Sequence, residues 1–277
     1  MITDTAQRWL LGQDIRRPAG EPIKTSAYDV VPIATIAEAA EFVRTHHYAG
    51  YASSTAHRFG LYLRGELAGV ALFGPPASTN AHHAVWGDLL DQIQAVTLGR
   101  LVLLDSVPGN GESWFVARCF DHLRDRGVLG VESCADPEPR HSDTGETVFR
   151  GHLGTIYCAL NGRYVGKTND STLRLFPDGT CLSNRSAGKL VRGERGDTHP
   201  VAQLERWGAT PLDPAEDPLT WLRYWRKRLT RKMRHRGCHR YLWSLSKRHR
   251  RALLDRHEEL PYPKLPGWLG RVIVGPS

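Results

Sequence analysis

Apolar residues in the first part of the chain change from helical to strand spacing. Between residues 36 and 46 they recur every three or four positions, which predicts a helix that ends within residues 47–50. Short β-type runs at residues 58–62 and 67–73 flank the tripeptide Arg64-Gly65-Glu66. This arrangement predicts a β-hairpin with a glycine-containing turn.

The middle of the chain has the order strand, loop, helix, strand. A dense apolar run at residues 95–104 predicts a buried central strand, and a short helix is expected before it at residues 86–93. Residues 113–126 place apolar side chains largely on one side, so they predict an amphipathic helix, which Gly127 ends. A further apolar run at residues 128–134 predicts the next strand. This order is a βαβ unit, whose two strands run parallel.

Turn residues indicate two later hairpins, one around Asn161-Gly162 and one around Pro177-Asp178-Gly179. The first joins residues 154–160 to 163–165, and the second joins residues 173–176 to 180–182. Late strands of this kind often complete a mixed sheet. Together with the βαβ unit they predict an α/β protein whose mixed central sheet is flanked by helices.

The composition changes after residue 212. Two prolines precede a helical pattern over residues 219–236, Gly237 interrupts it, and the pattern at residues 260–264 is extended. We therefore expect a catalytic domain at residues 1–212 and a basic, mainly helical C-terminal extension at residues 213–277.

Positive charge is concentrated in that extension. Residues 221–251 hold 13 Lys or Arg and no Asp or Glu, and without them the formal charge of +8 becomes −5. Cations interleaved with tryptophan and tyrosine suit nucleic-acid phosphates and bases, better than a membrane surface. A solvated basic helix that docks through its aromatic residues is the alternative. The expected phosphate contacts are Arg226, Lys227, Arg228, Arg231, Lys232, Arg234, Arg236 and Arg240.

The five cysteines are scattered and odd in number, without a C-x-x-C pair, which argues against a disulfide framework. The N-terminus has an acid, Asp4, before its first basic residue and no long apolar run, so neither a signal peptide nor a membrane span is expected. We expect a protein of the reducing cytoplasm.

The loop between the central strand and the amphipathic helix contains Gly109, Asn110, Gly111 and Ser113. Backbone N–H groups at such a helix N-terminus hold phosphate oxygens, so we expect these residues to bind a cofactor. The two glycines match the coenzyme A loop of GNAT acetyltransferases, but Ser106 stands where that pattern has Gln or Arg. A plain strand-to-helix turn is the alternative.

Several motifs, taken together, resemble the Mom family of phage DNA-modification proteins across residues 30–205. They are His46-His47-Tyr48-Ala-Gly50, Phe59-Gly60-Leu-Tyr62, Gly69-Val70-Ala71, Arg100-Leu101, Asp136-Pro137 and the stretch from Gly151 to Gly166. The resemblance implies a GNAT-like fold that places a carbamoylmethyl group on the exocyclic amine of adenine in DNA, which shields phage DNA from restriction. For the donor it implies either acetyl-coenzyme A or an iron-assisted route. Cys134 departs from the larger aromatic residue that the family pattern leads us to expect.

The resemblance also implies the site residues. His47, Tyr48, Asp136 and Tyr157 become catalytic candidates, and Arg100 becomes a candidate for holding the donor. Arg100 interrupts an apolar strand, so its charge needs an acid, a phosphate or solvent. Asp136 follows a parallel strand, at the edge where open α/β sheets bind ligands. His, Tyr and Asp side chains suit ferrous iron as well, but no metal ligand is assigned.

Three functions follow from these observations. The first is a DNA base-modifying transferase with double-stranded DNA as its partner, working in the cytoplasm of a bacterial host. The second is a GNAT acetyltransferase acting on a small amine or a protein. The third is a DNA-binding protein without catalytic activity.

Overall fold

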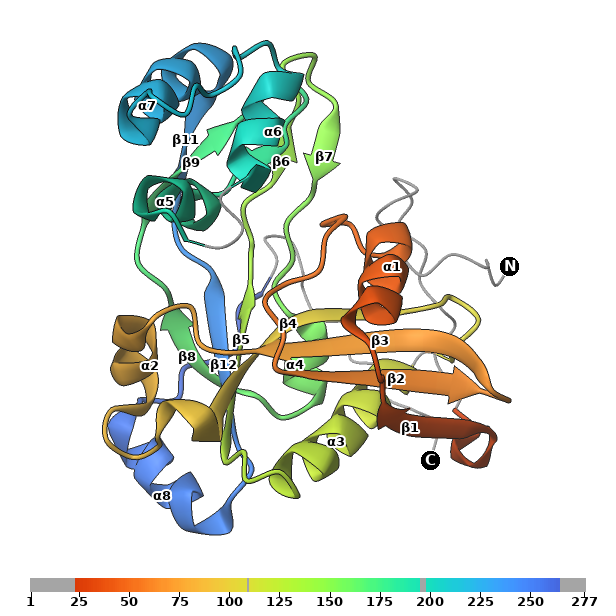
Figure 1. Cartoon of the computed structure of the whole chain (residues 1–277). Helices are drawn as coiled ribbons and strands as arrows, with labels where there is room; N and C mark the ends of the chain where they lie inside the picture. Colours follow the sequence, from red (N-terminus) through yellow and green to blue (C-terminus); the bar gives the residue numbers. More distant parts are fainter. Residues whose placement is uncertain (1–22, 109, 195–197, 265–277) are drawn as a thin grey trace. The chain divides into compact units, whose positions relative to one another are not determined.

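The computed structural model describes residues 23–264 except Gly109 and residues 195–197 (Figure 1). Its central sheet has seven strands in the order β1-β2-β3-β4-β5-β12-β8. The strands are β1 (Tyr28–Pro32), β2 (His57–Leu63), β3 (Glu66–Gly74), β4 (Ala95–Leu103), β5 (Gly130–Ala135), β8 (Arg163–Lys167) and β12 (His239–Ser244). β4 and β5 run parallel, whereas β1 to β4 pair antiparallel in succession and β12 pairs antiparallel with β5. The expected α/β class with a mixed central sheet flanked by helices is confirmed.

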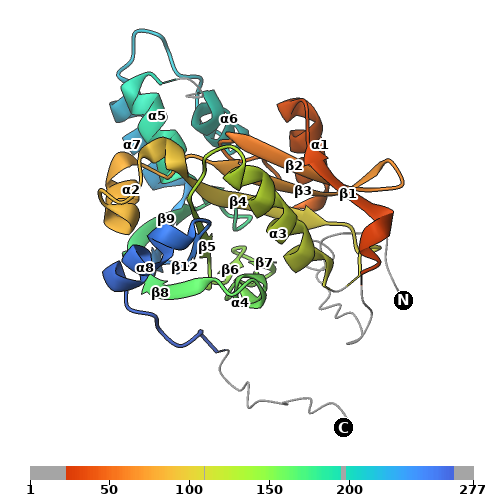
Figure 2. The same ribbon diagram turned by 90° about the horizontal axis from the view of Figure 1, so that it is seen from below.

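Helices cover both faces of this sheet, so the middle of β3 is buried on both sides. Val70 and Leu72 pack against α1 (Ile36–His46), whereas Ala71 and Phe73 belong to the core that includes α3 (Gly111–Arg124). Alternate side chains of a strand point to opposite faces, which explains why α1 and α3 lie on opposite sides (Figure 2).

Two further helices cover the sheet at the β12 end. Val85 and Trp86 of α2 (Thr79–Trp86) pack with Leu242 of β12 and Leu253 of α8 (Lys247–Arg256). Ser78 caps α2 by accepting a hydrogen bond from the Ala81 amide at 3.1 Å. Short 3₁₀ helices lie at Thr25–Ala27 and Gln92–Gln94. In the described part of the chain, no helix combines the length and the apolar character that crossing a membrane requires.

The chain forms two compact units. The first contains the seven-stranded sheet and comprises Met1–Ala135, Leu153–Gly166 and His239–Ser277; the second comprises Asp136–His152 and Lys167–Cys238. The second unit contains the three-stranded sheet β10-β9-β11 and the strand pair β6-β7. Its strands are β6 (Arg140–His141), β7 (Thr147–Phe149), β9 (Ser171–Leu175), β10 (Cys181–Leu182) and β11 (Arg231–His235).

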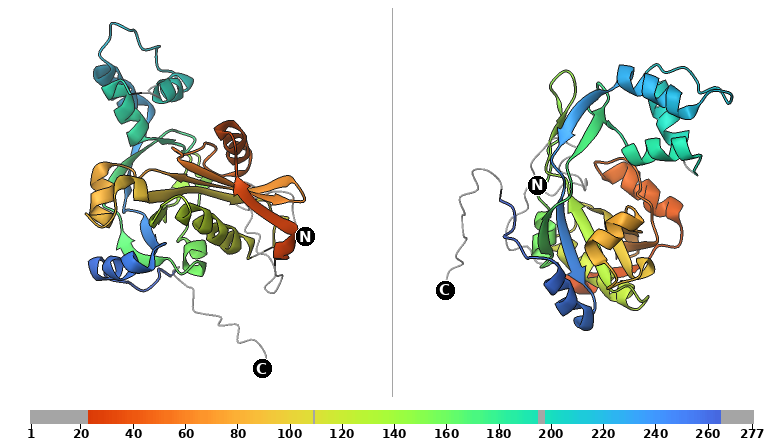
Figure 3. Two further views of the ribbon diagram at one scale, coloured as in Figure 1. Left: turned by 60° about the horizontal axis from the view of Figure 1, so that its bottom comes forward. Right: turned by 90° about the vertical axis from the view of Figure 1, so that its left-hand side faces the viewer.

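Three helices complete the second unit: α5 (Asn184–Arg192), α6 (Thr198–Arg206) and α7 (Pro218–Leu229). Figure 3 shows them gathered beside β9 and β11. They enclose a core that contains Phe176, Leu190, Leu204 and Trp221. The second unit therefore has a hydrophobic core of its own.

Most expected elements are confirmed, including the first helix, the early hairpin, the βαβ unit and the hairpin between β9 and β10. The first of the two later hairpins is wrong, because residues 155–159 form the helix α4 (Thr155–Ala159) and only β8 joins the sheet. The short helix expected at residues 86–93 is also misplaced, since α2 ends at Trp86.

The basic extension differs most from expectation. The helix expected over residues 219–236 ends at Leu229, and residues 231–235 form β11, which pairs with β9. β12 then lies between β5 and β8 in the central sheet. The chain crosses between the two units at residues 135–136, 152–153, 166–167 and 238–239, whereas the expected boundary lay near residue 212.

Candidate functional site

The parallel strands β4 and β5 pair over only three positions. Residues 95–97 of β4 face residues 130–132 of β5, and the ladder ends there. Beyond it, the buried Ser133 hydroxyl donates to the Leu98 carbonyl at 3.0 Å. β4 continues to Leu103 while it pairs only with β3, so its backbone groups toward β5 are left outside the ladder. This open end is where the carboxyl ends of parallel strands hold ligands.

A β-bulge aims the next side chain at this open end. Leu72 of β3 faces Arg100, and the neighbouring Phe73 faces Leu98, so Gly99 is the extra residue. A Cβ atom at Gly99 would lie 2.6 Å from Ser53 Oγ, and glycine is therefore the residue that fits. The bulge changes the direction of the side chain that follows it, which is Arg100.

Arg100 carries a charge that no described carboxylate neutralises by an ion pair. Its guanidinium donates to the carbonyl oxygens of Tyr51, at 3.1 Å, and Gly99. The Tyr51 ring lies under the guanidinium, with Cζ 4.6 Å from the ring centroid. A partly buried cation with only neutral partners favours the binding of an anion or of a developing negative charge.

Tyr157 of α4 supplies a buried hydroxyl close to Arg100. Burial raises the pKa of Tyr157 far above its ordinary value of 10.0, and the nearby Ser133 side chain opposes this rise. Tyr48 and Cys134 raise the pKa of Tyr157 further, whereas the charge of Arg100 lowers it. The phenol therefore stays protonated at neutral pH and acts as a hydrogen-bond donor.

His47 and Tyr48 stand next to each other at the end of α1. The His47 side chain is buried, and its ring centroid lies 4.2 Å from that of Tyr48. The Ala49 amide donates to His47 Nδ1 at 3.0 Å, so the neutral ring carries its hydrogen on Nε2. Of the sequence candidates, Tyr48 and Arg100 each lie within electrostatic reach of Tyr157, and all three belong to the first unit.

The expected cofactor loop has strong internal contacts. Asn110 Oδ1 accepts a hydrogen bond from the Ile23 amide at 2.9 Å, and the Ser113 hydroxyl donates to the Asn110 carbonyl. At Gly111, a Cβ atom would lie 2.3 Å from Val107 Cγ1. Gly109 lies outside the described residues. The first amides of α3 still form a helix N-terminus of the kind that attracts phosphates.

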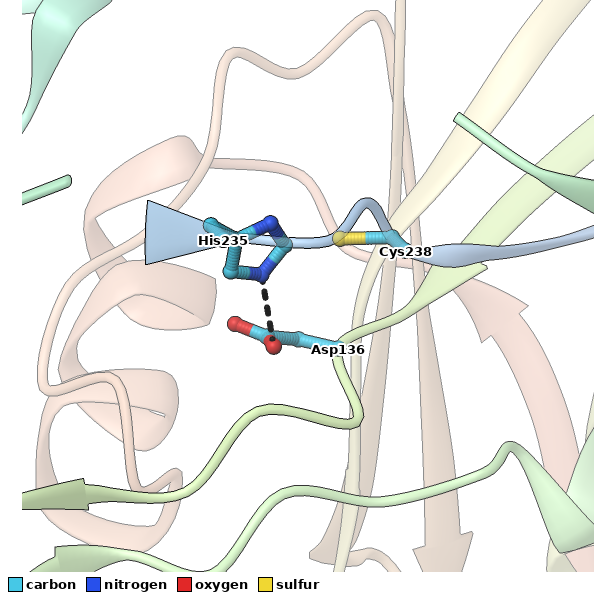
Figure 4. Close-up of side chains that lie close together, drawn as sticks. All are labelled: Asp136, His235 and Cys238. Carbon is cyan, nitrogen blue, oxygen red and sulfur yellow. Dashed lines mark hydrogen bonds and ion pairs between the residues drawn. The ribbon is translucent and has the colours of Figure 1, made fainter. Parts of the chain in front are cut away.

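Asp136 belongs to the second unit, whereas the other catalytic candidates belong to the first. Its Oδ1 accepts hydrogen bonds from the Glu138 amide at 3.0 Å and from His235 Nε2 at 2.9 Å (Figure 4). Its Oδ2 accepts one from Arg140 at 3.1 Å. Three donors thus hold the carboxylate, which makes Asp136 an organising residue of this unit.

Cys238 completes a compact group with Asp136 and His235, whose potential ligand atoms lie within 4.8 Å of one another. Such O, N and S donors are found in zinc and iron sites. However, the Gly237 amide donates to His235 Nδ1 at 3.2 Å, which places the ring hydrogen on Nε2, toward Asp136. His235 and Asp136 thus hold each other by a hydrogen bond, and the expected His, Tyr and Asp set for iron is not assembled within one unit.

Sequence reasoning missed Arg140, His235, Cys238 and Ser133. Arg140 follows Asp136 by four residues, but nothing in the sequence marks it as the partner of that carboxylate. His235 and Cys238 lie inside the cationic segment, whose charge pattern gave no sign of a buried histidine. Alternation along β11 was the available signal, because it separates His235 from its exposed neighbours Arg234 and Arg236.

The cations of that segment have different surroundings. Arg231 pairs with Asp143 at 2.8 Å, and Arg234 pairs with Asp170 at 2.9 Å. Arg228 is exposed, with its Cζ 3.5 Å from the Tyr224 ring centroid. Three further exposed side chains are Lys227, Lys232 and Arg236, and Arg226 is partly buried.

Arg240, which the sequence predicts to contact phosphate, lies within the central sheet. It lies on β12, opposite Cys134 of β5, and its Nε is 2.8 Å from Oε1 of the buried Glu132. The contact is an ion pair between a partly buried guanidinium and a buried carboxylate. The charge of Arg240 is therefore used inside the sheet.

Residues 29–264 match the model of a family described as the Mom protein family. No protein of curated function matches the chain in sequence.

Similar solved structures include acetyltransferases. An N-acetyltransferase from Staphylococcus aureus Mu50 is 9% identical, with 79% of this chain and 99% of that chain covered and a TM-score of 0.35. A polyamine N-acetyltransferase from Drosophila melanogaster is 12% identical over 78% of this chain and 100% of that one, with a TM-score of 0.36. A GNAT family acetyltransferase from Brucella melitensis, solved with acetyl-CoA, is 16% identical over 38% and 74%, with a TM-score of 0.28. Similarity at this level does not identify a substrate.

Proposed function

The chain belongs to the Mom protein family, and on this premise we propose that it is a transferase that modifies the exocyclic amine of adenine in DNA. The group added is of the carbamoylmethyl or acyl type, and its presence protects phage DNA from restriction. The observation that carries the proposal is the uncompensated charge of Arg100 beside the protonated Tyr157 hydroxyl, at the open end of the β4–β5 ladder.

These two residues support transfer chemistry in complementary ways. When the adenine amine bonds to the acyl carbon of a thioester donor, negative charge would develop on the acyl oxygen. The carbon–sulfur bond would then break, and the departing thiolate would take up the proton that the amine releases. Arg100 stabilises that negative charge, and Tyr157 donates a hydrogen bond to it. The His47 ring, whose Nδ1 accepts from the Ala49 amide, packs against the Tyr48 ring in the same unit.

For an added group of the acyl type, an acyl-coenzyme A is the donor that we propose. Its phosphates would be held by the N-terminus of α3, within the loop that contains Asn110, Gly111 and Ser113. When bound, it supplies an activated acyl carbon. Iron enters no step of this proposal.

Double-stranded DNA is the proposed partner. Exposed cations of α7 and β11 that have no acidic partner among the described residues, Lys227, Arg228 and Lys232, supply the charge that phosphate contacts require. Because the adenine amine is poorly reachable inside a duplex, the base is expected to flip out or to be modified in single-stranded DNA.

Mass spectrometry of nucleosides tests the function. DNA from bacterial cells that express the full chain is digested and compared with DNA from cells that carry the empty vector. A new deoxyadenosine species is expected. Unmodified DNA together with tight DNA binding would instead indicate a DNA-binding protein without catalysis, and acylated small amines or proteins would indicate an ordinary acetyltransferase.

A further inference from the structure

Two cations face each other across the strands β9 and β11. The antiparallel register places Lys232 directly opposite Arg174. Side chains in such pairs have Cβ atoms about 5 Å apart, and like charges in this arrangement destabilise a sheet. Neither residue has an ion-pair partner among the described residues. The pair is thus an unrelieved repulsion in the free protein.

A third cation, Arg226, comes from α7. The pKa of Arg174 is lowered by burial and, in addition, by the charge of Arg226, so the two guanidinium groups lie close enough to repel each other. Arg226 also lacks a carboxylate partner among the described residues. Two strands and one helix therefore bring three positive charges together without a compensating acid.

Neighbouring arginines of the same strand show that acids are within reach of this sheet. Arg231 has Asp143 as its partner, and Arg234 has Asp170. The lack of an acid is therefore a local property of Arg174, Lys232 and Arg226.

We propose that Arg174, Lys232 and Arg226 form a binding site for a backbone phosphate of DNA. This inference rests on the proposed function, and it assigns DNA contact to Arg174, which lies outside the cationic segment of the sequence. A phosphate oxygen accepts hydrogen bonds from a guanidinium fork and from an ammonium group at once. A bound phosphate also relieves the repulsion between the three cations. The free energy that this repulsion costs the free protein therefore adds to the free energy of binding.

Salt dependence of DNA binding tests the proposal. R174Q and K232Q are compared with R234Q, which removes one positive charge from the same sheet, but one that Asp170 already balances. For R174Q and K232Q we expect roughly tenfold weaker binding of a duplex oligonucleotide and a salt slope smaller by up to about 0.9. R234Q should keep a salt slope near that of wild type. Equal slopes for R174Q, K232Q and wild type would overturn the proposal.

Thermal unfolding of the full chain gives a second readout. At low salt, R174Q and K232Q should raise the unfolding midpoint because repulsion is removed, and the gain should shrink as salt screens it. R234Q should leave the midpoint unchanged or lower it. A loss of stability in both R174Q and K232Q would contradict the repulsion on which the site depends.

Two further arms separate the sources of phosphate and the two proposals. Duplex DNA without donor should raise the unfolding midpoint of wild type more than that of R174Q, whereas coenzyme A should raise both midpoints equally. An R174Q protein that responds normally to DNA but has lost its response to coenzyme A would overturn the DNA assignment. Nucleoside mass spectrometry is run on the same variants. Weak DNA binding by R174Q in a protein that never modifies DNA would refute the transferase and leave the phosphate site standing.

Discussion

Glu132 of β5 is a carboxylate inside the central sheet, with 8% of its side chain exposed. Burial raises the pKa of Glu132 above its ordinary value of 4.5, and the nearby Arg240 opposes that rise. The pair explains why one arginine of a strongly basic segment lies in a sheet. Sequence alone assigned Arg240 to phosphate contact, because its charge was visible and its strand partner was not.

R240M should destabilise the protein by about 3 to 5 kcal/mol at neutral pH, because it leaves a buried carboxylate without its counter-charge. A raised folded-state pKa gives stability that is present below the unfolded value and is lost as pH rises through the folded value. Without Arg240 the pKa of Glu132 rises further, so the loss should grow as pH increases above 4.5. Urea unfolding of wild type and variant across this range measures it.

The matched control is E132Q combined with R240M. Replacing both partners removes the buried charge, so the double variant should be more stable than R240M alone at neutral pH. A stable R240M protein that had lost DNA binding would instead support the phosphate contact expected from the sequence.

The candidate site residues show how much of the site the sequence predicts. The motifs indicated Tyr48, Arg100 and Tyr157, and the structure brings these three into one unit. They also indicated Asp136, which belongs to the other unit. A motif gives the order of residues along the chain, but the pairing of β5 with β12 and the contacts of Asp136 with His235 depend on residues about 100 positions away.

At the scale of elements, tight packing at the start of α3 explains the glycine at position 111. Gly111 has no room for a Cβ atom because Val107 Cγ1 would lie 2.3 Å from it. G111A should therefore cost about 1 to 3 kcal/mol through overpacking. Thermal or urea unfolding measures the loss.

Adding V107A to G111A should restore part of the lost stability. It removes the atom that a Cβ atom at residue 111 would meet, so the double variant should lose less stability than the two single losses added together. Strict additivity would show that the contact with Val107 does not explain the glycine.

Elements whose pattern is dominated by local spacing were predicted well, among them α1, the β2–β3 hairpin and the β4–α3–β5 unit. The errors have tertiary causes. Residues 231–235 continue a helical, cationic pattern, but pairing with β9 holds them in a strand. Tyr157 lies in a helix that Gly154 starts in a left-handed conformation, where a hairpin was expected from the following Asn161-Gly162.

At the scale of the whole molecule, the two compact units do not follow the change in composition near residue 212. The rise in positive charge after residue 212 is real, but both β11 and β12 lie beyond that point and pair with strands from earlier in the chain. Charge clustering reports a surface property, whereas the division into units follows contacts between distant segments.

Deletion of residues 213–277 should therefore abolish folding rather than only DNA binding. It removes β12 from between β5 and β8, and it removes β11 and the buried Trp221 from the second unit. Soluble yield and circular dichroism of the truncated chain measure this, with the full-length chain as control. A folded truncated protein that had lost only its affinity for DNA would instead show that residues 213–277 form an appended basic arm.

The most direct test of the transfer site is the amount of modified deoxyadenosine in DNA from cells that express Y157F or R100Q. Wild type is the reference, and R118Q, a change at the partly exposed Arg118 of α3, is the matched control. Loss of a hydrogen-bond donor to developing charge typically costs 10²- to 10³-fold in rate. Y157F and R100Q should therefore lower the adduct by about a hundredfold or more with DNA binding retained, and R118Q should match wild type. Full adduct levels in both Y157F and R100Q would show that the chemistry occurs elsewhere.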